Sequence, residues 1–295
     1  MSADTATSSP QLRPLALGEI LDVAIKLVRR NWRTLAVLVL VVAVPVAVIN
    51  FLVTASTTTY DATLDVRSPE DGSAYDAGQF VNTLLGIALY LVVSVGCVQV
   101  VGEAYMGRTP AWPSALRFGA RRALPALGLS ILYILGLFFG FIALVIPAIF
   151  LAVRWSVAWP ALVLERRGPI AALGRSWHLV SGFWWKCFGT LLIAYLLLIV
   201  VSIAFGAVIG GVLAALSSVD SFLGLVLQQA VNVALQVFTL PLVAAVTVVL
   251  YVDLRVRKEG FDLALAADRI AHPDRSVSFG AVAEPEPARH PAFGE

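Results

Sequence analysis

Six apolar stretches constrain this chain more than any other feature of its sequence. They lie at residues 34–53, 80–101, 124–142, 147–164, 183–214 and 222–252. A helix rises about 1.5 Å per residue, so about 20 residues match a hydrocarbon core of about 30 Å. The chain is 59% hydrophobic and only 14% charged, where soluble proteins have roughly half and about a quarter. These features predict an all-α, polytopic integral membrane protein with six transmembrane helices.

The connection between the third and fourth stretches decides how many spans there are. Residues 124–164 hold too many apolar residues for one span and enough for two. Pro147 suits the first turn of a new helix, so we expect the chain to turn between Gly140 and Pro147. One long tilted helix is the alternative, and it would move every later basic segment to the opposite side of the membrane. The distribution of charge favours two spans.

A basic amphipathic segment precedes each pair of spans. These segments are residues 14–33, 102–125 and 168–182, and each carries apolar side chains on one face at helical spacing. Such helices are too polar to span and lie in the membrane interface, with their basic side chains toward anionic headgroups. The expected headgroup contacts are Lys26, Arg29, Arg30, Arg117, Arg121, Arg122, Arg166, Arg167 and Arg175.

The pattern predicts three hairpins, each preceded by a cytoplasmic amphipathic interfacial helix. All 21 Lys and Arg residues except Arg67 then fall on one side or within the membrane. Because cytoplasmic loops carry an excess of Lys and Arg, we expect a bacterial plasma-membrane protein with both termini in the cytoplasm. Residues 14–265 form the expected membrane domain, with an acidic outer loop at 54–79. Residues 1–13 and 266–295 are expected to be disordered tails.

Arg154 is the charge whose depth in the membrane matters most. If its span runs from Pro147 to Leu164, the guanidinium lies where a charge costs a few kcal/mol or more unless it is paired or hydrated. It would then face a water-filled cavity and bind an anionic headgroup or substrate. If the span begins nearer Phe139, the side chain reaches the cytoplasmic surface instead. The nearest carboxylates that could pair with it are Glu103, Glu165 and Asp253.

Gln228, Asn232 and Gln236 recur every four residues and share one face of the last span. Polar side chains in lipid prefer the interior of a helix bundle, where they bond helix to helix or line a path for a solute. Both interpretations stay open, and together with Arg154 these residues form a candidate intramembrane polar site. Two small-xxx-small patterns predict close helix packing, and they are Gly136 with Gly140 and Gly206 with Gly210.

Patterns typical of enzymes and metal sites are missing from the sequence. It contains no HExxH, Ser/His/Asp set, Walker loop or pair of carboxylates. Cys97 and Cys187 lack the spacing of a zinc or redox site, and we interpret them as small hydrophobic residues. We therefore expect no enzyme activity, no metal and no cofactor, and nothing supports binding to nucleic acid.

Three stretches together resemble a known family. They are RPLALGEILDVAIKLVRRNW at residues 13–32, PAIFLAVRWSVAWPALVLE with GPIAALGRSWHLVSGFWWKCFG at 147–165 and 168–189, and LYVDLRVRKEGFDL at 250–263. Over residues 13–265 the chain is similar to actinobacterial proteins of the glycerophosphoryl diester phosphodiesterase membrane domain family, which is related to YciC-like membrane proteins.

The resemblance implies a polytopic membrane protein without an established reaction. Some relatives carry a soluble phosphodiesterase barrel of a couple of hundred further residues, so the resemblance does not imply that activity here. Arg154 and Trp155 stand where the family pattern has Arg-Trp, which suggests importance for that position without giving it a role.

The sequence thus favours a non-enzymatic membrane protein that engages anionic lipid and scaffolds or regulates envelope proteins. Its partners would be membrane lipids and unidentified proteins, and a homo-oligomer is compatible with the pattern. The alternative is a small transporter or lipid translocator that uses Arg154 and the face of Gln228, Asn232 and Gln236. An enzyme of lipid metabolism is a distant third.

Overall fold

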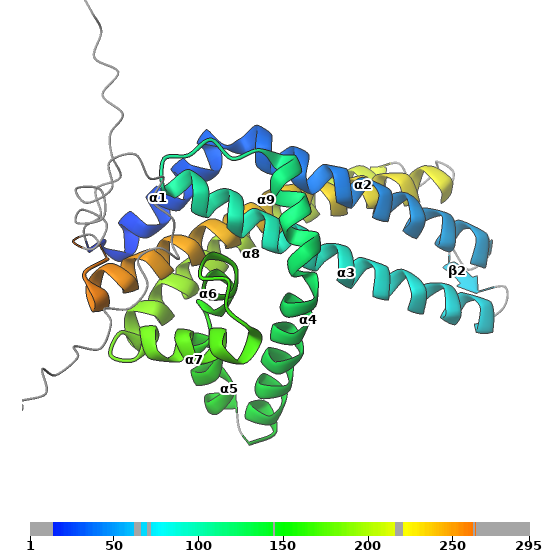
Figure 1. The fold of residues 1–295 in the computed structure, drawn as a ribbon. Coiled ribbons are helices and arrows are strands. Elements are labelled where there is room, and N and C mark those ends of the chain that lie inside the picture. The colour runs from blue at the N-terminus through cyan, green and yellow to red at the C-terminus, as the bar shows by residue number, and fades with distance from the viewer. Residues whose placement is uncertain are drawn as a thin grey trace, which may run out of the picture.

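The computed structural model describes residues 14–61, 66–69, 72–143, 145–215, 221–261 and 263. The expected tails at 1–13 and 266–295 lie outside these residues. The described residues form nine helices and one two-stranded hairpin (Figure 1). The elements are α1 (Leu17–Arg30), α2 (Trp32–Thr57), β1 (Thr58–Asp61), β2 (Val66–Pro69), α3 (Gly72–Tyr105), α4 (Trp112–Ala143), α5 (Val145–Arg154), α6 (Ala158–Leu164), α7 (Pro169–Val180), α8 (Trp184–Ala215) and α9 (Ser221–Glu259).

Six helical segments are long and apolar enough to cross a membrane, which makes the chain a multi-pass membrane protein. The candidate spans are Trp32–Thr54, Asp76–Tyr105, Trp112–Ala143, Val145–Leu164 (α5 together with α6), Trp184–Ala207 and Val226–Glu259. Large apolar side chains stay exposed along α2, α4 and α8, including Leu52 at 58% and Ile134 at 65%. Lipid is the environment in which such a surface is stable.

Helix α1 is built as a surface helix with one buried stripe. Ile20 and Ala24, four residues apart, are fully buried, whereas Lys26 is exposed. The backbone N–H of Ala16 donates to Glu19 Oε2 at 2.8 Å, which satisfies one of the free donors at the start of the helix. Arg29 and Arg30 occupy the last turn, where positive charge favours the helix dipole.

The expected turn between the third and fourth spans is confirmed. Helices α4 and α5 are separate, with only residue 144, outside the described residues, between them, so the alternative of one long helix is wrong. Gly140 allows the two helices to approach, because a Cβ at that position would lie 3.1 Å from Ala148 Cα. The basic segment at 102–125, which precedes the third span, does not form a separate helix, because α4 runs unbroken from Trp112 through Pro125.

The expected fourth span at 147–164 is divided into α5 and α6. Residues Trp155, Ser156 and Val157 form a turn between them. Pro160 explains the break, because proline has no N–H for the carbonyl four residues earlier and is tolerated in the first turn of a helix.

The connection between α2 and α3 is shorter than the expected loop at 54–79. Helix α2 continues to Thr57 and α3 begins at Gly72. Between them β1 and β2 pair antiparallel, with Thr59 opposite Ser68.

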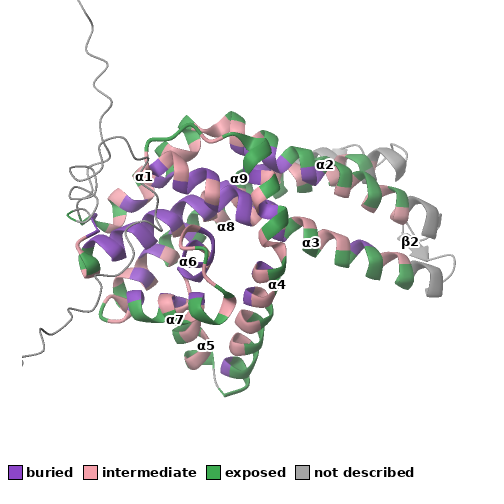
Figure 2. Ribbon diagram, in the orientation of Figure 1, coloured by how far each residue is buried: buried purple, intermediate pink, exposed green. Residues whose placement is uncertain are grey.

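The buried core lies toward one end of the molecule. Figure 2 shows buried residues concentrated along α9 and the helices around it, near α1, α6 and α7. On α9 every residue from Val248 to Val256 is buried, including Asp253 and Arg255. The opposite ends of α2 and α3, which lead to β1 and β2, present mostly exposed and half-buried side chains. The end formed by α1, α6, α7 and the buried part of α9 is therefore a packed layer, and it contains several charged side chains.

Candidate functional site

Ser176 of α7 bridges the break between α5 and α6. Its hydroxyl donates to the Arg154 carbonyl oxygen at 2.8 Å and accepts from the Val157 N–H at 3.3 Å. Ser176 is fully buried. A single side chain therefore satisfies one acceptor and one donor that the interrupted helix leaves free, and it fixes α7 against the break.

Arg154 ends α5 beside this bridge, and aromatic faces hold its guanidinium. The Arg154 Cζ lies 4.7 Å from the centre of the Trp177 ring and 5.1 Å from that of Phe150. Nη1 donates to the Trp177 carbonyl oxygen at 3.3 Å, while the buried Nε has no hydrogen-bond partner. Because a guanidinium carries five N–H donors, most of its hydrogen-bonding capacity is left for a ligand.

Aromatic rings continue from this site onto α8. Phe150 lies edge-on to Trp177 with 5.9 Å between ring centres, and it stacks on Trp184 at 6.0 Å. Trp185 next in the chain is 77% exposed. A belt of tryptophans is typical of the boundary between hydrocarbon and water.

The three expected carboxylate partners of Arg154 interact with other groups. Glu103 accepts from Gln99 Nε2 at 3.0 Å. Glu165 and Asp253 belong to two ionic clusters described below. Among the described residues no salt bridge involves Arg154, and these three possible partners are engaged elsewhere.

Glu165 is the centre of the first cluster, which joins α6, α7 and α9. Arg175 Nε donates to Glu165 Oε1 at 2.8 Å, Arg255 lies 4.0 Å away, and Tyr251 donates its hydroxyl to the same carboxylate. Arg175 and Arg255 also pair with Glu259. Glu165 and Glu259 thus offset the charges of Arg175 and Arg255 where three helices meet, and Arg167 also pairs with Glu165.

The pKa values in this cluster follow from its contacts. Burial raises the pKa of Glu165, but hydrogen bonds from Tyr251 and Arg175 and the charges of Arg175 and Arg255 outweigh burial, so its pKa lies below the ordinary value. Burial lowers the pKa of Arg175, and its bonds to Glu259 and Glu165 reverse that effect and raise it. Both groups are therefore held in their charged forms.

Asp253 is the centre of the second cluster, which clamps the start of the described chain. Its carboxylate has 0% side-chain exposure and binds Lys186 Nζ and Arg257 Nε. Asp253 Oδ1 also accepts from the Leu15 backbone N–H at 2.7 Å. The Leu15 carbonyl oxygen in turn accepts from Lys186 at 2.8 Å and from Arg257 at 2.9 Å. The segment before α1 is thereby fixed to α8 and α9.

The nine basic residues expected to contact headgroups divide into two groups. Six of them are exposed and present their charge to the surroundings, namely Lys26, Arg29, Arg30, Arg117, Arg121 and Arg166. Three are engaged within the protein. Arg122 donates to the carbonyl oxygens of Arg166 and Arg167, Arg167 pairs with Glu165, and the Arg175 side chain is only 11% exposed.

The stripe of Gln228, Asn232 and Gln236 on α9 is exposed along its length. A bond between helices is made by the neighbouring Gln229, whose Nε2 donates to Asn50 Oδ1 of α2 at 3.4 Å. Gln236 also lines a cavity of about 180 Å³ between α2, α3 and α9, to which Tyr90 contributes. The polar stripe is thus open to the outside of the bundle.

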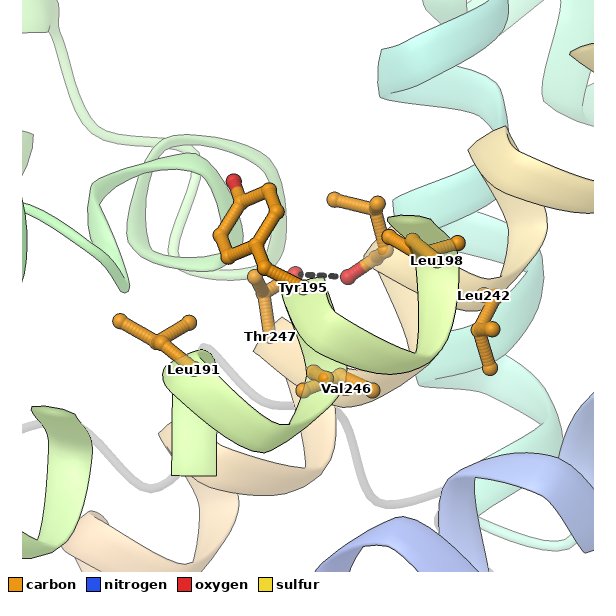
Figure 3. Close-up of a pocket in the computed structure, with 8 residues that line it drawn as sticks. Leu191, Tyr195, Leu198, Leu242, Val246 and Thr247 are labelled. Atoms are coloured by element: carbon orange, nitrogen blue, oxygen red, sulfur yellow. Dashed lines mark hydrogen bonds between the residues drawn. The ribbon is translucent and has the colours of Figure 1, made fainter. Parts of the chain in front are cut away.

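The space between α8 and α9 is smaller than the cavity beside Gln236 and is lined mainly by apolar side chains. Figure 3 shows Leu191, Tyr195 and Leu198 of α8 facing Leu242, Val246 and Thr247 of α9, with the Thr247 hydroxyl bonded to the carbonyl oxygen of Val243. The cavity they enclose is about 20 Å³. It has room for about one water molecule and no solute.

The expected glycine packing holds for one pair. A Cβ on Gly136 would lie 2.2 Å from the Trp155 ring, so this glycine makes room for the tryptophan beside Arg154. Gly206 has nothing within 4 Å of such a Cβ, and Gly210 side-chain surroundings are outside the described residues. The prediction that Gly206 mediates close packing is wrong for the single chain.

Metal and thiol chemistry have no obvious place in the described part of the chain. No group of three His, Cys, Asp or Glu residues there could hold a metal ion. Cys97 and Cys187 are free thiols that are both fully buried.

Two functional positions were missed at the level of sequence. Ser176 lies in an amphipathic segment in which a serine is not unusual. Only Pro160 indicated the helix break that Ser176 bridges. Lys186 lies at the start of an apolar stretch, and its pairing with Asp253, 67 positions later, is visible only in the structure.

The apolar helices, the lipid-exposed surface and the buried ionic layer at one end define a multi-pass helical membrane protein. The chain belongs to the family described as Domain of unknown function (DUF7847), whose model matches residues 73–254. The match includes the helix break and both Glu165 and Asp253, and it leaves out α1 and α2. No curated protein and no solved structure matches the chain.

Proposed function

We propose that this protein is a non-enzymatic component of the bacterial plasma membrane that engages anionic phospholipid and thereby scaffolds or regulates envelope proteins. The observation that carries the proposal is Arg154, a guanidinium whose buried Nε has no hydrogen-bond partner among the described residues. A phosphate group would supply the missing acceptors, because its oxygens match the arginine fork.

The depth of Arg154 suits a headgroup. Trp177 and Trp184 surround the site, and tryptophans gather at the level of the headgroups. The α7 backbone that Ser176 ties to Arg154 also carries Arg175 and His178, which favours an interfacial position for the whole segment. A charge at this level avoids most of the cost of the hydrocarbon core.

Exposed basic side chains support the same function. Lys26, Arg29 and Arg30 extend from α1, and Arg117 and Arg121 extend from α4. Each basic residue near an anionic surface contributes about 1 kcal/mol. Because Lys and Arg are concentrated on the cytoplasmic side of membrane proteins, we place these basic side chains and both termini in the cytoplasm. Arg175, which is paired with two glutamates, does not belong to the lipid-binding set.

A lipid translocator is the second candidate, and the exposed stripe on α9 favours it. Gln228, Asn232 and Gln236 are open to the membrane, and Gln236 lines a cavity of about 180 Å³. Such a stripe could guide a headgroup between leaflets. Proteoliposomes would decide: scrambling that survives both Arg154→Ala and Asn232→Leu removes these residues from any route.

The resemblance to the glycerophosphoryl diester phosphodiesterase membrane domain family remains part of this proposal. It is compatible with a protein that holds lipid or an envelope partner near the membrane. An enzyme of lipid metabolism stays a distant third, because neither ionic cluster contains a free nucleophile or base.

Lipid retention tests the proposal. The purified protein is titrated with phosphatidylglycerol or phosphatidylcholine, and bound lipid is counted by native mass spectrometry. We expect a preference for phosphatidylglycerol that Arg154→Gln weakens about fivefold, the equivalent of about 1 kcal/mol, and that Arg154→Lys partly keeps. Arg67→Gln, the same charge change on β2, is the matched control. Equal retention by wild type and Arg154→Gln would overturn the role of Arg154.

A further inference from the structure

We propose that α4 and α5 form a re-entrant hairpin, which enters the cytoplasmic leaflet and returns without crossing the membrane. The partner of its apolar tip is the acyl chains of that leaflet. This inference revises the six-span expectation, which length and hydropathy alone support, and it does not depend on the proposed function.

The tip of the hairpin carries no polar side chain. Residues 134–153 read ILGLFFGFIALVIPAIFLAV, whereas the connection at 54–79 is rich in Asp, Ser and Thr and that at 216–220 holds two serines and an aspartate. A connection that surfaces in water normally carries polar and turn-forming residues. Phe141 and Ile142 are 64% and 65% exposed, and Ile146 is 76% exposed. These side chains need hydrocarbon around them.

The length of α5 gives the depth that the tip reaches. The helix has 10 residues, so it rises about 14 Å, or about half of a hydrocarbon core of about 30 Å. Its far end is Arg154, whose guanidinium lies over the rings of Trp177 and Phe150, and Phe150 in turn stacks on Trp184. If Arg154 is interfacial, the tip ends near the middle of the bilayer.

The opposite placement would bring charged groups into the membrane. For the tip to reach the outer surface, Arg154 would have to lie near mid-membrane. The hydrogen bond from Ser176 to the Arg154 carbonyl would then draw α7 inward, together with Arg175 and the Glu165 cluster that binds it. Moving this many charges into hydrocarbon is far more costly than leaving the tip within the leaflet.

The turn is suited to a site without water. Only residue 144 separates the two helices, so little backbone lies outside them. Pro147 in the first turn of α5 lacks one of the N–H groups that would otherwise be free. A returning hairpin at this depth is tolerated where its backbone groups are satisfied internally.

The direction of the hairpin agrees with this inference. In Figure 1, α4 and α5 run across the direction of α2, α3, α8 and α9, and their turn lies far from β2. Four helices then cross the membrane and one hairpin dips into it. Because the hairpin begins and ends on the same side, the orientation of the basic segments is unchanged.

Single cysteines labelled in proteoliposomes of known orientation test the proposal. The wild type provides the background, because Cys97 and Cys187 are fully buried. A membrane-impermeant maleimide should label Asp76→Cys from the outer side and Ser114→Cys from the cytoplasmic side, both exposed positions. Ile142→Cys should react from neither side until detergent is added. Labelling of Ile142→Cys from the Asp76 side, or from the Ser114 side, would overturn the proposal.

A depth measurement distinguishes a mid-membrane tip from an apolar tip at the outer interface. A nitroxide on Ile142→Cys should show high collision with oxygen and low collision with a water-soluble nickel chelate, which corresponds to the bilayer centre. A depth in the outer headgroup region would contradict re-entry. Ile146→Cys serves as a second position, with gel filtration as the check of folding for both variants.

Discussion

The hydroxyl of Ser176 donates to the carbonyl oxygen of Arg154 at 2.8 Å, joining α7 to the end of α5. The Ser176 hydroxyl oxygen also accepts from the Val157 N–H at 3.3 Å. The interrupted helix, the guanidinium and the surface helix are thereby one unit. The position of Arg154 in the membrane therefore depends on α7 as much as on its own helix.

Ser176→Ala should destabilise the protein by about 1–3 kcal/mol, because it leaves a buried N–H and a buried carbonyl without this partner. The free energy of unfolding in mixed micelles measures the loss. Ser130→Ala is the matched control, since the half-buried Ser130 hydroxyl bonds only within its own helix to the Ala126 carbonyl oxygen at 2.9 Å. Equal losses in the two variants would mean that the bridge has no special role.

Asp253→Asn should cost about 3–5 kcal/mol, because it leaves Lys186 and Arg257 without their buried counter-charge. It should also release Leu15 and make the segment before α1 more sensitive to protease. Unfolding free energy and limited proteolysis provide the two readouts.

The control for this clamp is Asp22→Asn. Asp22 pairs with Lys26 one helical turn away, but the two side chains are 59% and 71% exposed. An exposed pair of this kind contributes less than about 1 kcal/mol. A comparable loss in both variants would contradict the clamp.

Acidification should weaken the Glu165 cluster. The pKa of Glu165 in the folded protein lies below its ordinary value of 4.5, so below that value the unfolded chain binds more protons than the folded one. The stability contributed by Glu165 is therefore full above the ordinary pKa and is lost as the pH falls through the lower folded pKa.

The pH dependence of unfolding measures this effect. Glu165→Gln should flatten the acid limb and lower stability at neutral pH, where Arg175 loses its partner. If stability falls at low pH as steeply in Glu165→Gln as in the wild type, carboxylates other than Glu165 cause the loss.

Gly136→Ala should be destabilising by about 1–3 kcal/mol, because the new Cβ would lie 2.2 Å from the Trp155 ring and force it to move. Gly206→Ala should be neutral or stabilising by up to about 1 kcal/mol, since nothing lies within 4 Å of that Cβ and alanine favours a helix. Thermal denaturation of the two variants gives the comparison. The reverse order would refute the assignment of packing to Gly136.

The sequence was sufficient for the apolar helices and for the turn before Pro147, because hydropathy and proline placement are local signals. It was not sufficient for the break at Trp155 to Val157. The apolar stretch at 147–164 has the composition of one continuous span, and only Pro160 indicates that the helix is interrupted. The continuity of α4 through Pro125 was also unexpected, since packing against neighbouring helices compensates for the missing N–H.

The ionic clusters depend on contacts between distant parts of the chain. Glu165 and Glu259 are 94 positions apart and meet through Arg175. Charge counts predict on which side such residues lie but not which ones pair. For that reason Arg175 was expected to face lipid, although its partners are carboxylates within the protein.

The identity of the lipid beside Arg154 is the most direct test of lipid engagement. A photoreactive phenylalanine analogue replaces Trp177, whose ring lies 4.7 Å from the guanidinium, and is activated in native membranes. Mass spectrometry then identifies any lipid adduct. If Arg154 engages anionic lipid, anionic phospholipid should make up more of the adducts than its share of the bilayer, and Arg154→Gln should reduce this enrichment. Adducts that match bulk lipid composition in both proteins would contradict it.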